Sequence, residues 1–142
     1  MERILVIEDD LALNAGLRFE LDTKGYISVA AYNCAKARYL LSSETFSLIL
    51  LDVNLPDGNG FDLCREIKRA HPDLPVIFLT ANDLETDVLN GFDLGAEDYV
   101  TKPFSMPILL RRVEVALRRK EKGSGPEADL WSDGYLVLNF SA

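Results

Sequence analysis

The sequence has few of the residues that build soft-metal and redox sites. Its 142 residues include two cysteines and one histidine. Cys34 and Cys64 form no CxxC motif and no metal-type cluster, which excludes a zinc site and a dithiol redox site. We therefore expect both cysteines to be reduced packing residues. The histidine, His71, precedes Pro72 at a predicted helix end, where we expect it to lie on the surface.

Long hydrophobic runs and excess positive charge are absent as well. No segment approaches the ~18 apolar residues that cross a bilayer, so we expect no membrane partner. The opening MERILVIEDD places acidic residues where a signal peptide needs its cleavage region, which predicts a cytoplasmic chain. The net charge of −8 argues against direct nucleic-acid binding by these residues, because phosphate contacts need a basic surface.

Apolar runs alternate with amphipathic segments along most of the chain. Near-continuous apolar strands separated by helices of about a dozen residues predict a parallel sheet covered on both faces, a doubly wound α/β domain. Asp10 and Asn33 can cap helices, and Gly25 can end the first one; Asp10 could alternatively belong to a metal shell. The expected strands cover residues 3–8, 26–31, 47–51, 75–80 and 97–102, and the expected helices cover 10–24, 33–42, 60–70, 83–94 and 105–120.

The composition changes near residue 122. We expect the α/β domain to span 1–122 and the segment GSGPEAD, 123–129, to be a linker. The last residues, 130–142, contain two short apolar segments around Asp133-Gly134, a hairpin signal. Because an isolated hairpin is marginal, we expect the chain to be a truncated piece of a longer protein.

Carboxylates follow two of the predicted strands. The run SLILL ends on Asp52, and burying an unpaired carboxylate there would cost several kcal/mol, so Asp52 either faces solvent or has a cationic partner. Ligands of open α/β sheets bind at the carboxyl ends of the strands. That edge collects Glu8 and Asp9 from the first strand, Thr80 from the fourth and Lys102 from the fifth.

These side chains suit phosphoryl transfer. Asp9 and Asp52 would repel one another unless a hard divalent cation lay between them, and magnesium prefers such carboxylate oxygens. A carboxylate oxygen of Asp52 could attack phosphorus. Lys102 and the hydroxyl of Thr80 could each bind a phosphoryl oxygen, because this chemistry needs charge neutralisation and positioning.

Four motifs identify a family. ILVIEDD, LLDVNLPDGNGFDLC, VIFLTA and GAEDYVTKPF resemble, in order and spacing, the receiver domains of bacterial response regulators over about residues 2–121. The resemblance implies a flavodoxin-like five-stranded sheet in the order 2-1-3-4-5. It also implies a phosphoacceptor switch, not an enzyme, in which a sensor histidine kinase phosphorylates Asp52.

The resemblance assigns further roles. It implies Mg²⁺ held by the side chains of Asp9 and Asp52, by the backbone carbonyl of Asn54 and, through water, by Glu8. It implies a cis peptide between Lys102 and Pro103, which chemistry permits before proline. Tyr99 is either core packing or, in the family's terms, an aromatic switch that moves with Thr80.

The family also suggests a dimer and an output. Glu97, Asp98, Arg112 and Arg119 fit a homodimer face made of the helix over 83–94, the strand over 97–102 and the helix over 105–120. Val88 and Ile108 stand where a basic and an acidic partner would be expected, which departs from the pattern. The tail is similar to the start of the winged-helix domain of the OmpR/PhoB subfamily, so DNA binding would belong to the missing output domain.

Two other functions are compatible with parts of this residue set. Haloacid-dehalogenase-type phosphatases also combine an Asp nucleophile with Thr, Lys and magnesium, but they call for a second acid where this chain has Asn54. An atypical receiver that takes no phosphate and acts as a binding module is the other alternative. The dimer-face departures leave that alternative open.

Overall fold

Strands and helices alternate along the described part of the chain. The computed structural model describes residues 2–80, 96, 98–102 and 104–122, with the backbone alone described at 80 and 120–122. The predicted helix over 83–94, the linker over 123–129 and the segment over 130–142 lie outside these ranges. The elements are β1 (Arg3–Ile7), α1 (Leu11–Thr23), β2 (Ile27–Ala31), α2 (Cys34–Ser43), β3 (Leu48–Asp52), β4 (Asn54–Leu55), β5 (Gly58–Asn59), α3 (Gly60–Ala70), β6 (Val76–Thr80), β7 (Asp98–Thr101) and α5 (Met106–Lys122).

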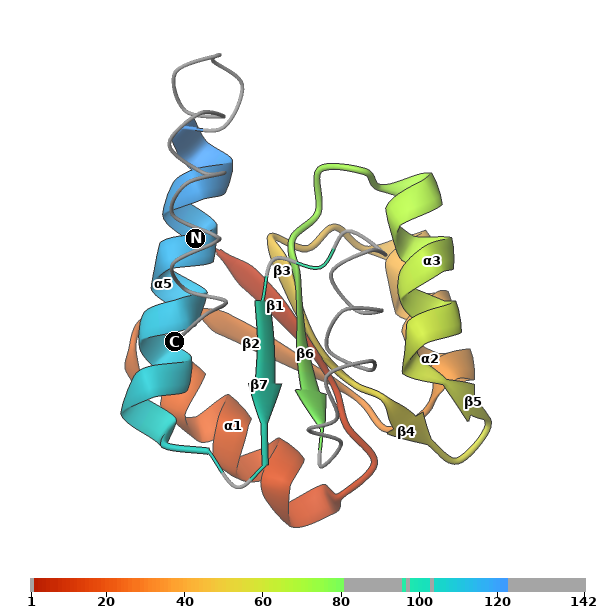
Figure 1. Ribbon diagram of the computed structural model, residues 1–142, viewed down its shortest axis with the longest axis horizontal. Coiled ribbons are helices and arrows are strands. Elements are labelled where there is room, and N and C mark those ends of the chain that lie inside the picture. Colours follow the sequence, from red (N-terminus) through yellow and green to blue (C-terminus); the bar gives the residue numbers. More distant parts are fainter. Residues whose placement is uncertain (1, 81–95, 97, 103, 123–142) are drawn as a thin grey trace.

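Five parallel strands form one sheet in the order β2-β1-β3-β6-β7 (Figure 1). Counting only these strands, the order is 2-1-3-4-5, as predicted. The order reverses between β1 and β3, so their carboxyl ends flank the point where ligands of such sheets bind. A separate two-stranded hairpin, β4 with β5, follows β3 directly and was not predicted.

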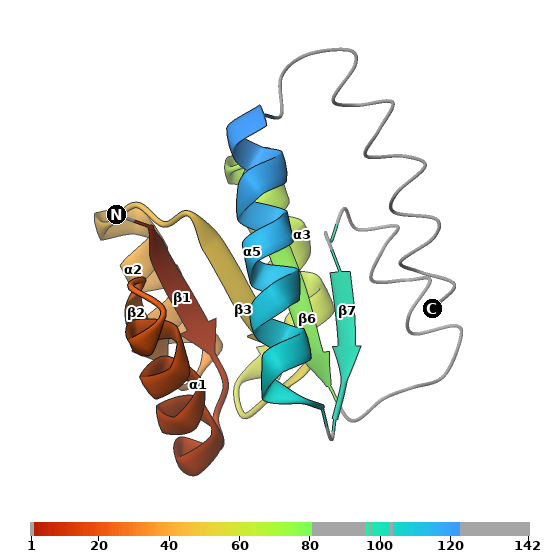
Figure 2. The ribbon, with the colours of Figure 1, turned by 90° about the vertical axis from the view of Figure 1, so that its left-hand side faces the viewer.

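Helices cover both faces of the sheet, α1 and α5 on one and α2 and α3 on the other (Figure 2). Alternate residues of β1 therefore enter different cores: Leu5 and Ile7 pack with α2 and α3, whereas Ile4 and Val6 pack with α1 and α5. All four are fully buried. This burial on both faces explains why the strands are almost continuously apolar.

Local side-chain bonds set the helix ends. The Oδ1 atom of Asp10 accepts the backbone N–H of Leu13 at 3.0 Å, which confirms Asp10 as the N-cap of α1. Asn33 caps α2 in the same way, through Lys36. Gly25 has a φ of 93°, the left-handed conformation that favours glycine after a helix.

The two cysteines behave as predicted. Cys34 and Cys64 are buried free thiols. Burial raises the pKa of each to about 11, so both stay protonated and unreactive at neutral pH. Within the described ranges, no helix combines the length and the apolar content that a bilayer crossing requires.

Candidate functional site

The sheet register brings the predicted site residues to one edge. Ile7 of β1 pairs with Leu51 of β3, so Glu8 and Asp52 each come next along neighbouring strands. Thr80, the last residue of β6, pairs with Thr101, the residue before Lys102. The parallel strands thus bring the residues at or just after the ends of β1, β3 and β7, together with the backbone of Thr80, to the carboxyl edge of the sheet, at the end where β4 and β5 lie in Figure 1.

Three carboxylates gather at this edge. One ligand oxygen from each of Glu8, Asp9 and Asp52 lies within 4.8 Å of the others. Glu8 is only 1% exposed and Asp52 only 4%, whereas Asp9 is exposed to solvent. The cluster therefore combines two buried acids with one accessible acid.

Lys102 supplies the positive charge that the buried acids require. Its Nζ atom lies 2.7 Å from Oε1 of Glu8 and 3.8 Å from Oδ2 of Asp52. The choice left open for Asp52 is resolved: it is buried and has a cationic partner. Burial lowers the pKa of Lys102, but the hydrogen bond to Glu8 and the charge of Asp52 outweigh it, so the pKa stands above its ordinary value.

The carboxylates remain in excess over the ammonium. Burial, and then the charge of Glu8, raise the pKa of Asp52 to about 7. Burial and the neighbouring Glu8 also raise the pKa of Asp9. One lysine cannot neutralise three acids, so the site favours a second cation, and an all-oxygen donor set suits a hard divalent ion.

Asn14, which the sequence analysis did not single out, holds the acidic loop in place. Its side chain is completely buried. Nδ2 donates to the carbonyls of Val6 at 3.2 Å and Glu8 at 3.0 Å, and Oδ1 accepts from Nε of Arg18 at 2.8 Å. The available signal was a polar residue three positions before Leu17, on the apolar stripe of α1.

The hairpin of residues 54–59 folds back so that Gly60, the residue after it, packs against the backbone of Asp52. A Cβ placed on Gly60 would lie 2.3 Å from the carbonyl oxygen of Asp52, and the Gly60 N–H donates to the carbonyl of Val53 at 2.6 Å. Only glycine permits this approach. The backbone N–H of Asn54 points to Oδ1 of Asp52 at 3.4 Å, so the turn closes over the carboxylate.

Tyr99 packs in the core, in line with the first of its two predicted roles. Its ring is 9% exposed and lies 5.9 Å from the ring of Phe78, which in turn lies 5.0 Å from Phe61. The role of Tyr99 as a switch stays a prediction. The side chain of Thr80 and the whole of Pro103, and with it the predicted cis peptide, lie outside the described part of the structure.

The predicted dimer face contains an ion pair within the chain. Nη1 of Arg112 lies 2.9 Å and 2.8 Å from the two carboxylate oxygens of Asp98. Ile108 is 54% exposed on the same helix, and Arg119 is half-buried. Glu97 and Val88, the other residues of this prediction, are outside the described ranges.

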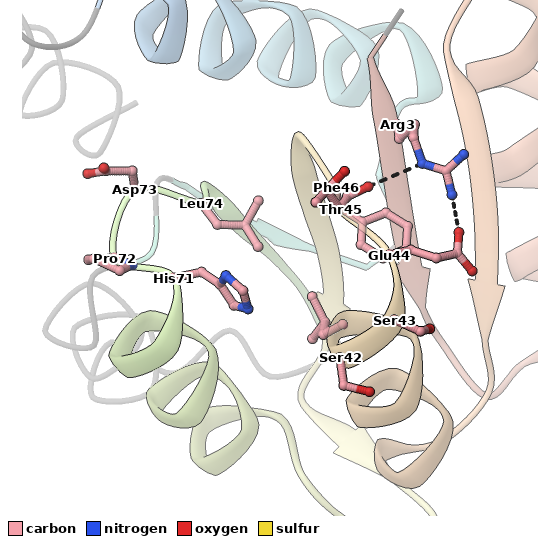
Figure 3. Close-up of a pocket in the computed structure, with 11 residues that line it drawn as sticks. Arg3, Ser42, Ser43, Glu44, Thr45, Phe46, His71, Pro72, Asp73 and Leu74 are labelled. Atoms are coloured by element: carbon pink, nitrogen blue, oxygen red, sulfur yellow. Dashed lines mark hydrogen bonds and ion pairs between the residues drawn. The ribbon is translucent and has the colours of Figure 1, made fainter.

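A hollow lies away from these residues, around the connection before β3. It has a volume of about 840 Å³ and includes Arg3, Phe46 and His71 (Figure 3). Arg3 is bonded there to Glu44 and to the carbonyl of Thr45. His71 is exposed, as predicted. Among the described residues that line this hollow there is no predicted phosphoryl-transfer residue.

The sequence is similar to proteins of one known family. A family model for the response regulator receiver domain matches residues 4–114. The transcriptional regulatory protein RprY of Bacteroides fragilis is 41% identical over 138 residues, which cover 96% of this chain and 58% of RprY. Response regulator MprA of Mycobacterium sp. (strain KMS) is 36% identical over 126 residues, 89% of this chain and 55% of MprA. The chain thus spans little more than half the length of these curated relatives.

Solved structures agree with the fold. A CheY-like receiver domain protein from Methanospirillum hungatei has a TM-score of 0.84 at 27% identity, covering 87% of this chain and 99% of that one. DrrB, a Thermotoga maritima OmpR/PhoB homolog, has a TM-score of 0.76 at 38% identity, covering 84% of this chain and 54% of that one. The BeF₃-activated receiver domain of DrrB has a TM-score of 0.77 at 38% identity, covering 84% of this chain and 99% of that one.

Proposed function

Because the chain belongs to the response regulator receiver domain family, we propose that it is a phosphorylation switch in which Asp52 accepts a phosphoryl group from a sensor histidine kinase. One observation carries the proposal. A buried carboxylate at the end of β3, its pKa raised to about 7, faces Glu8 and Lys102 across the ligand-binding edge of the sheet. A buried acid whose pKa is raised by burial and by a specific charged neighbour is a candidate for chemistry.

Mg²⁺ is the cofactor that the donor set fits best. The side chains of Asp9 and Asp52 would hold it, with the carbonyl of Asn54 as a third ligand and Glu8 acting through water. When bound, the ion supplies charge neutralisation for the phosphoryl oxygens. The buried negative charge of the cluster, which Lys102 only partly offsets, is the feature of the structure that supports this assignment.

The reaction transfers a phosphoryl group from the donor histidine to Asp52. An oxygen of Asp52 forms the new bond to phosphorus, the bond between phosphorus and the donor histidine nitrogen breaks, and the histidine keeps that electron pair. Lys102 then has a phosphoryl oxygen as an alternative partner to Glu8. The phosphoryl group carries about 1.5 to 2 negative charges in place of the single charge of the Asp52 carboxylate, and this change can bias the positions of Thr80 and Tyr99.

Mass spectrometry of the intact chain tests the acceptor. After incubation with Mg²⁺ and acetyl phosphate, we expect one added phosphoryl group on the wild type. None is expected in EDTA or on the Asp52→Asn variant. Asp62→Asn is the matched control, since Asp62 is an exposed acid paired with Arg65 on α3. Phosphorylation of Asp52→Asn to the wild-type level would remove the assignment, and an unmodified wild type would favour the phosphate-independent binding module.

The output is a second part of the proposal. We propose that residues 1–122 are the receiver, that 123–129 are a linker, and that 130–142 begin a winged-helix domain that binds DNA once complete. Dimerisation would use β7, α5 and the helix predicted over 83–94, and the whole regulator would act in the cytoplasm.

The proposed dimer face contains an ion pair that is already formed within one chain. Because Asp98 and Arg112 pair with each other there, they would have to exchange partners to bridge two copies. Gel filtration with beryllofluoride and Mg²⁺ should show a dimer if this is the output.

A further inference from the structure

Asp57, at the turn between β4 and β5, is bonded to a different part of the fold. Its Oδ1 atom accepts the backbone N–H of Cys34 at 2.7 Å, and its Oδ2 atom accepts that of Ala35 at 3.0 Å. Cys34 and Ala35 are the first two residues of α2. Two hydrogen bonds thus connect the turn that follows Asp52 to α2, a helix that lies on one face of the sheet and precedes the turn by more than ten residues in the sequence.

Packing supports the same attachment. A Cβ on Gly58 would lie 3.0 Å from Sγ of the buried Cys34, so the tip of the hairpin rests directly on the first turn of α2. At its other end the hairpin is held against the phosphoacceptor strand, where Gly60 meets the backbone of Asp52. Contacts therefore hold the 54–59 hairpin in place at two points, one beside Asp52 and one on α2.

The bonds of Asp57 are additional to the capping of α2. Asn33 already accepts the N–H of Lys36, so the helix has its own N-cap. Asp57 satisfies two earlier N–H groups of the first turn, where a negative charge is favoured. The helix consequently offers a fixed, positively polarised anchor for the carboxylate of the turn.

We propose that Asp57 is a positioning residue of the phosphoacceptor site: by tying the tip of the 54–59 hairpin to α2, it fixes Asn54 at the base of the hairpin. The inference rests on the proposed function, in which the Asn54 carbonyl is a ligand of Mg²⁺. Releasing the tip would let that carbonyl move while leaving Asp9 and Asp52 in place. Metal affinity should weaken without loss of the fold.

Three variants separate this role from a purely structural one. Asp57→Ala removes both bonds of the turn. Asp57→Asn removes the same charge but keeps an oxygen that can accept one N–H. Asn33→Ala weakens α2 by removing its own cap but keeps the Asp57 carboxylate and the two N–H groups that it accepts. Calorimetric titration with Mg²⁺ alone gives the dissociation constant for each variant, and thermal unfolding in EDTA gives its stability.

We expect Asp57→Ala to weaken Mg²⁺ binding by at least about threefold, less than the roughly 10- to 100-fold typical of groups bonded directly to a ligand. Asp57→Asn should show a smaller loss. Asn33→Ala should lower the unfolding temperature with no change in the dissociation constant.

Three results would overturn the inference. The first is a dissociation constant for Mg²⁺ that is unchanged in Asp57→Ala. The second is a loss of Mg²⁺ affinity in Asn33→Ala equal to that in Asp57→Ala. The third is the same loss of Mg²⁺ affinity in Asp57→Asn, which would make the effect one of charge alone. The wild type separates this inference from the proposed function. If the wild type binds no Mg²⁺, the proposed function fails and the inference with it, whereas normal wild-type binding and an unaffected Asp57→Ala remove the inference only.

Discussion

Lys102 pairs with Glu8, at 2.7 Å between Nζ and Oε1, more closely than with Asp52, at 3.8 Å. The lysine that the phosphoryl group would attract is thus already engaged by an acid that is only 1% exposed. A phosphoryl group on Asp52 would compete with Glu8 for the same ammonium. The ion pair therefore offers a route by which phosphorylation could change contacts at the β7 edge of the sheet.

Removing the lysine should be costly in the absence of metal. Lys102→Ala leaves Glu8 and Asp52 buried with no cation, and we expect a loss of about 2 kcal/mol or more in the free energy of unfolding in EDTA. Millimolar Mg²⁺ should restore part of that loss, because the ion supplies the missing charge. Denaturant unfolding with and without Mg²⁺ measures both effects. Equal losses in the two conditions would mean that metal and lysine do not neutralise the same acids.

Magnesium binding should depend on pH near neutrality. Burial and the charge of Glu8 raise the pKa of Asp52 to about 7, so below that pH a proton competes with the metal. We expect the affinity for Mg²⁺ to fall about tenfold for each pH unit between about pH 7 and pH 5. Titrations at several pH values test this, and a flat profile over that range would contradict the charge state assigned to Asp52.

The same shift has a consequence for stability without metal. The folded chain binds the Asp52 proton more tightly than the unfolded chain, whose carboxyl has the ordinary pKa near 3.8. The contribution of Asp52 to the free energy of unfolding is therefore greatest below that value and decreases as the pH rises toward about 7. Asp52→Asn should accordingly stabilise the metal-free chain more at pH 8 than at pH 5.

Glycine at position 60 should be required for the site. A Cβ there would meet the Asp52 carbonyl oxygen at 2.3 Å and Val53 Cα at 2.7 Å, both backbone atoms. We expect Gly60→Ala to lose about 1–3 kcal/mol of stability and most of the phosphorylation rate with acetyl phosphate. Gly16→Ala is the matched control, since a Cβ at Gly16 meets nothing within 4 Å and alanine favours helix α1. Normal phosphorylation of Gly60→Ala would contradict the tight turn.

Asn14 should contribute both stability and site geometry. Asn14→Leu leaves the carbonyls of Val6 and Glu8 without their side-chain donor, at a cost of about 1–3 kcal/mol. We also expect weaker Mg²⁺ binding, because the loop that carries Asp9 loses its support. Arg18→Ala serves as the control, because it removes the bond to Oδ1 of Asn14 and a 3.4 Å bond to the Tyr32 hydroxyl but keeps both bonds of Asn14 to the loop carbonyls. If the two variants bind Mg²⁺ equally, Asn14 has no part in positioning the acids.

The elements whose ends depend on local chemistry were predictable from the sequence. Asp10, Asn33 and Gly25 set helix ends through bonds or backbone angles that involve only nearby residues. The strand order came from the family resemblance, and the apolar runs indicated burial on both faces. The edge of the sheet that carries Asp52 and Lys102 then followed from the parallel arrangement.

The features that were missed depend on contacts between distant segments. The strands β4 and β5 have two residues each, too short for an alternating pattern, and Pro56-Asp57-Gly58 has the composition of a simple turn. The anchoring of Asp57 on α2 cannot be inferred without knowing how the hairpin folds back. The preference of Lys102 for Glu8 likewise depends on a difference between two distances, 2.7 Å to Glu8 and 3.8 Å to Asp52, which residue types do not specify.

The most direct test of the account is to locate the phosphoryl group. Borohydride reduces an acyl phosphate but leaves free carboxylates unchanged, so reduction followed by peptide mass spectrometry identifies the modified residue. After treatment with Mg²⁺ and acetyl phosphate, we expect reduction at Asp52 alone. Modification at Asp9, at Asp57 or at no carboxylate would contradict it.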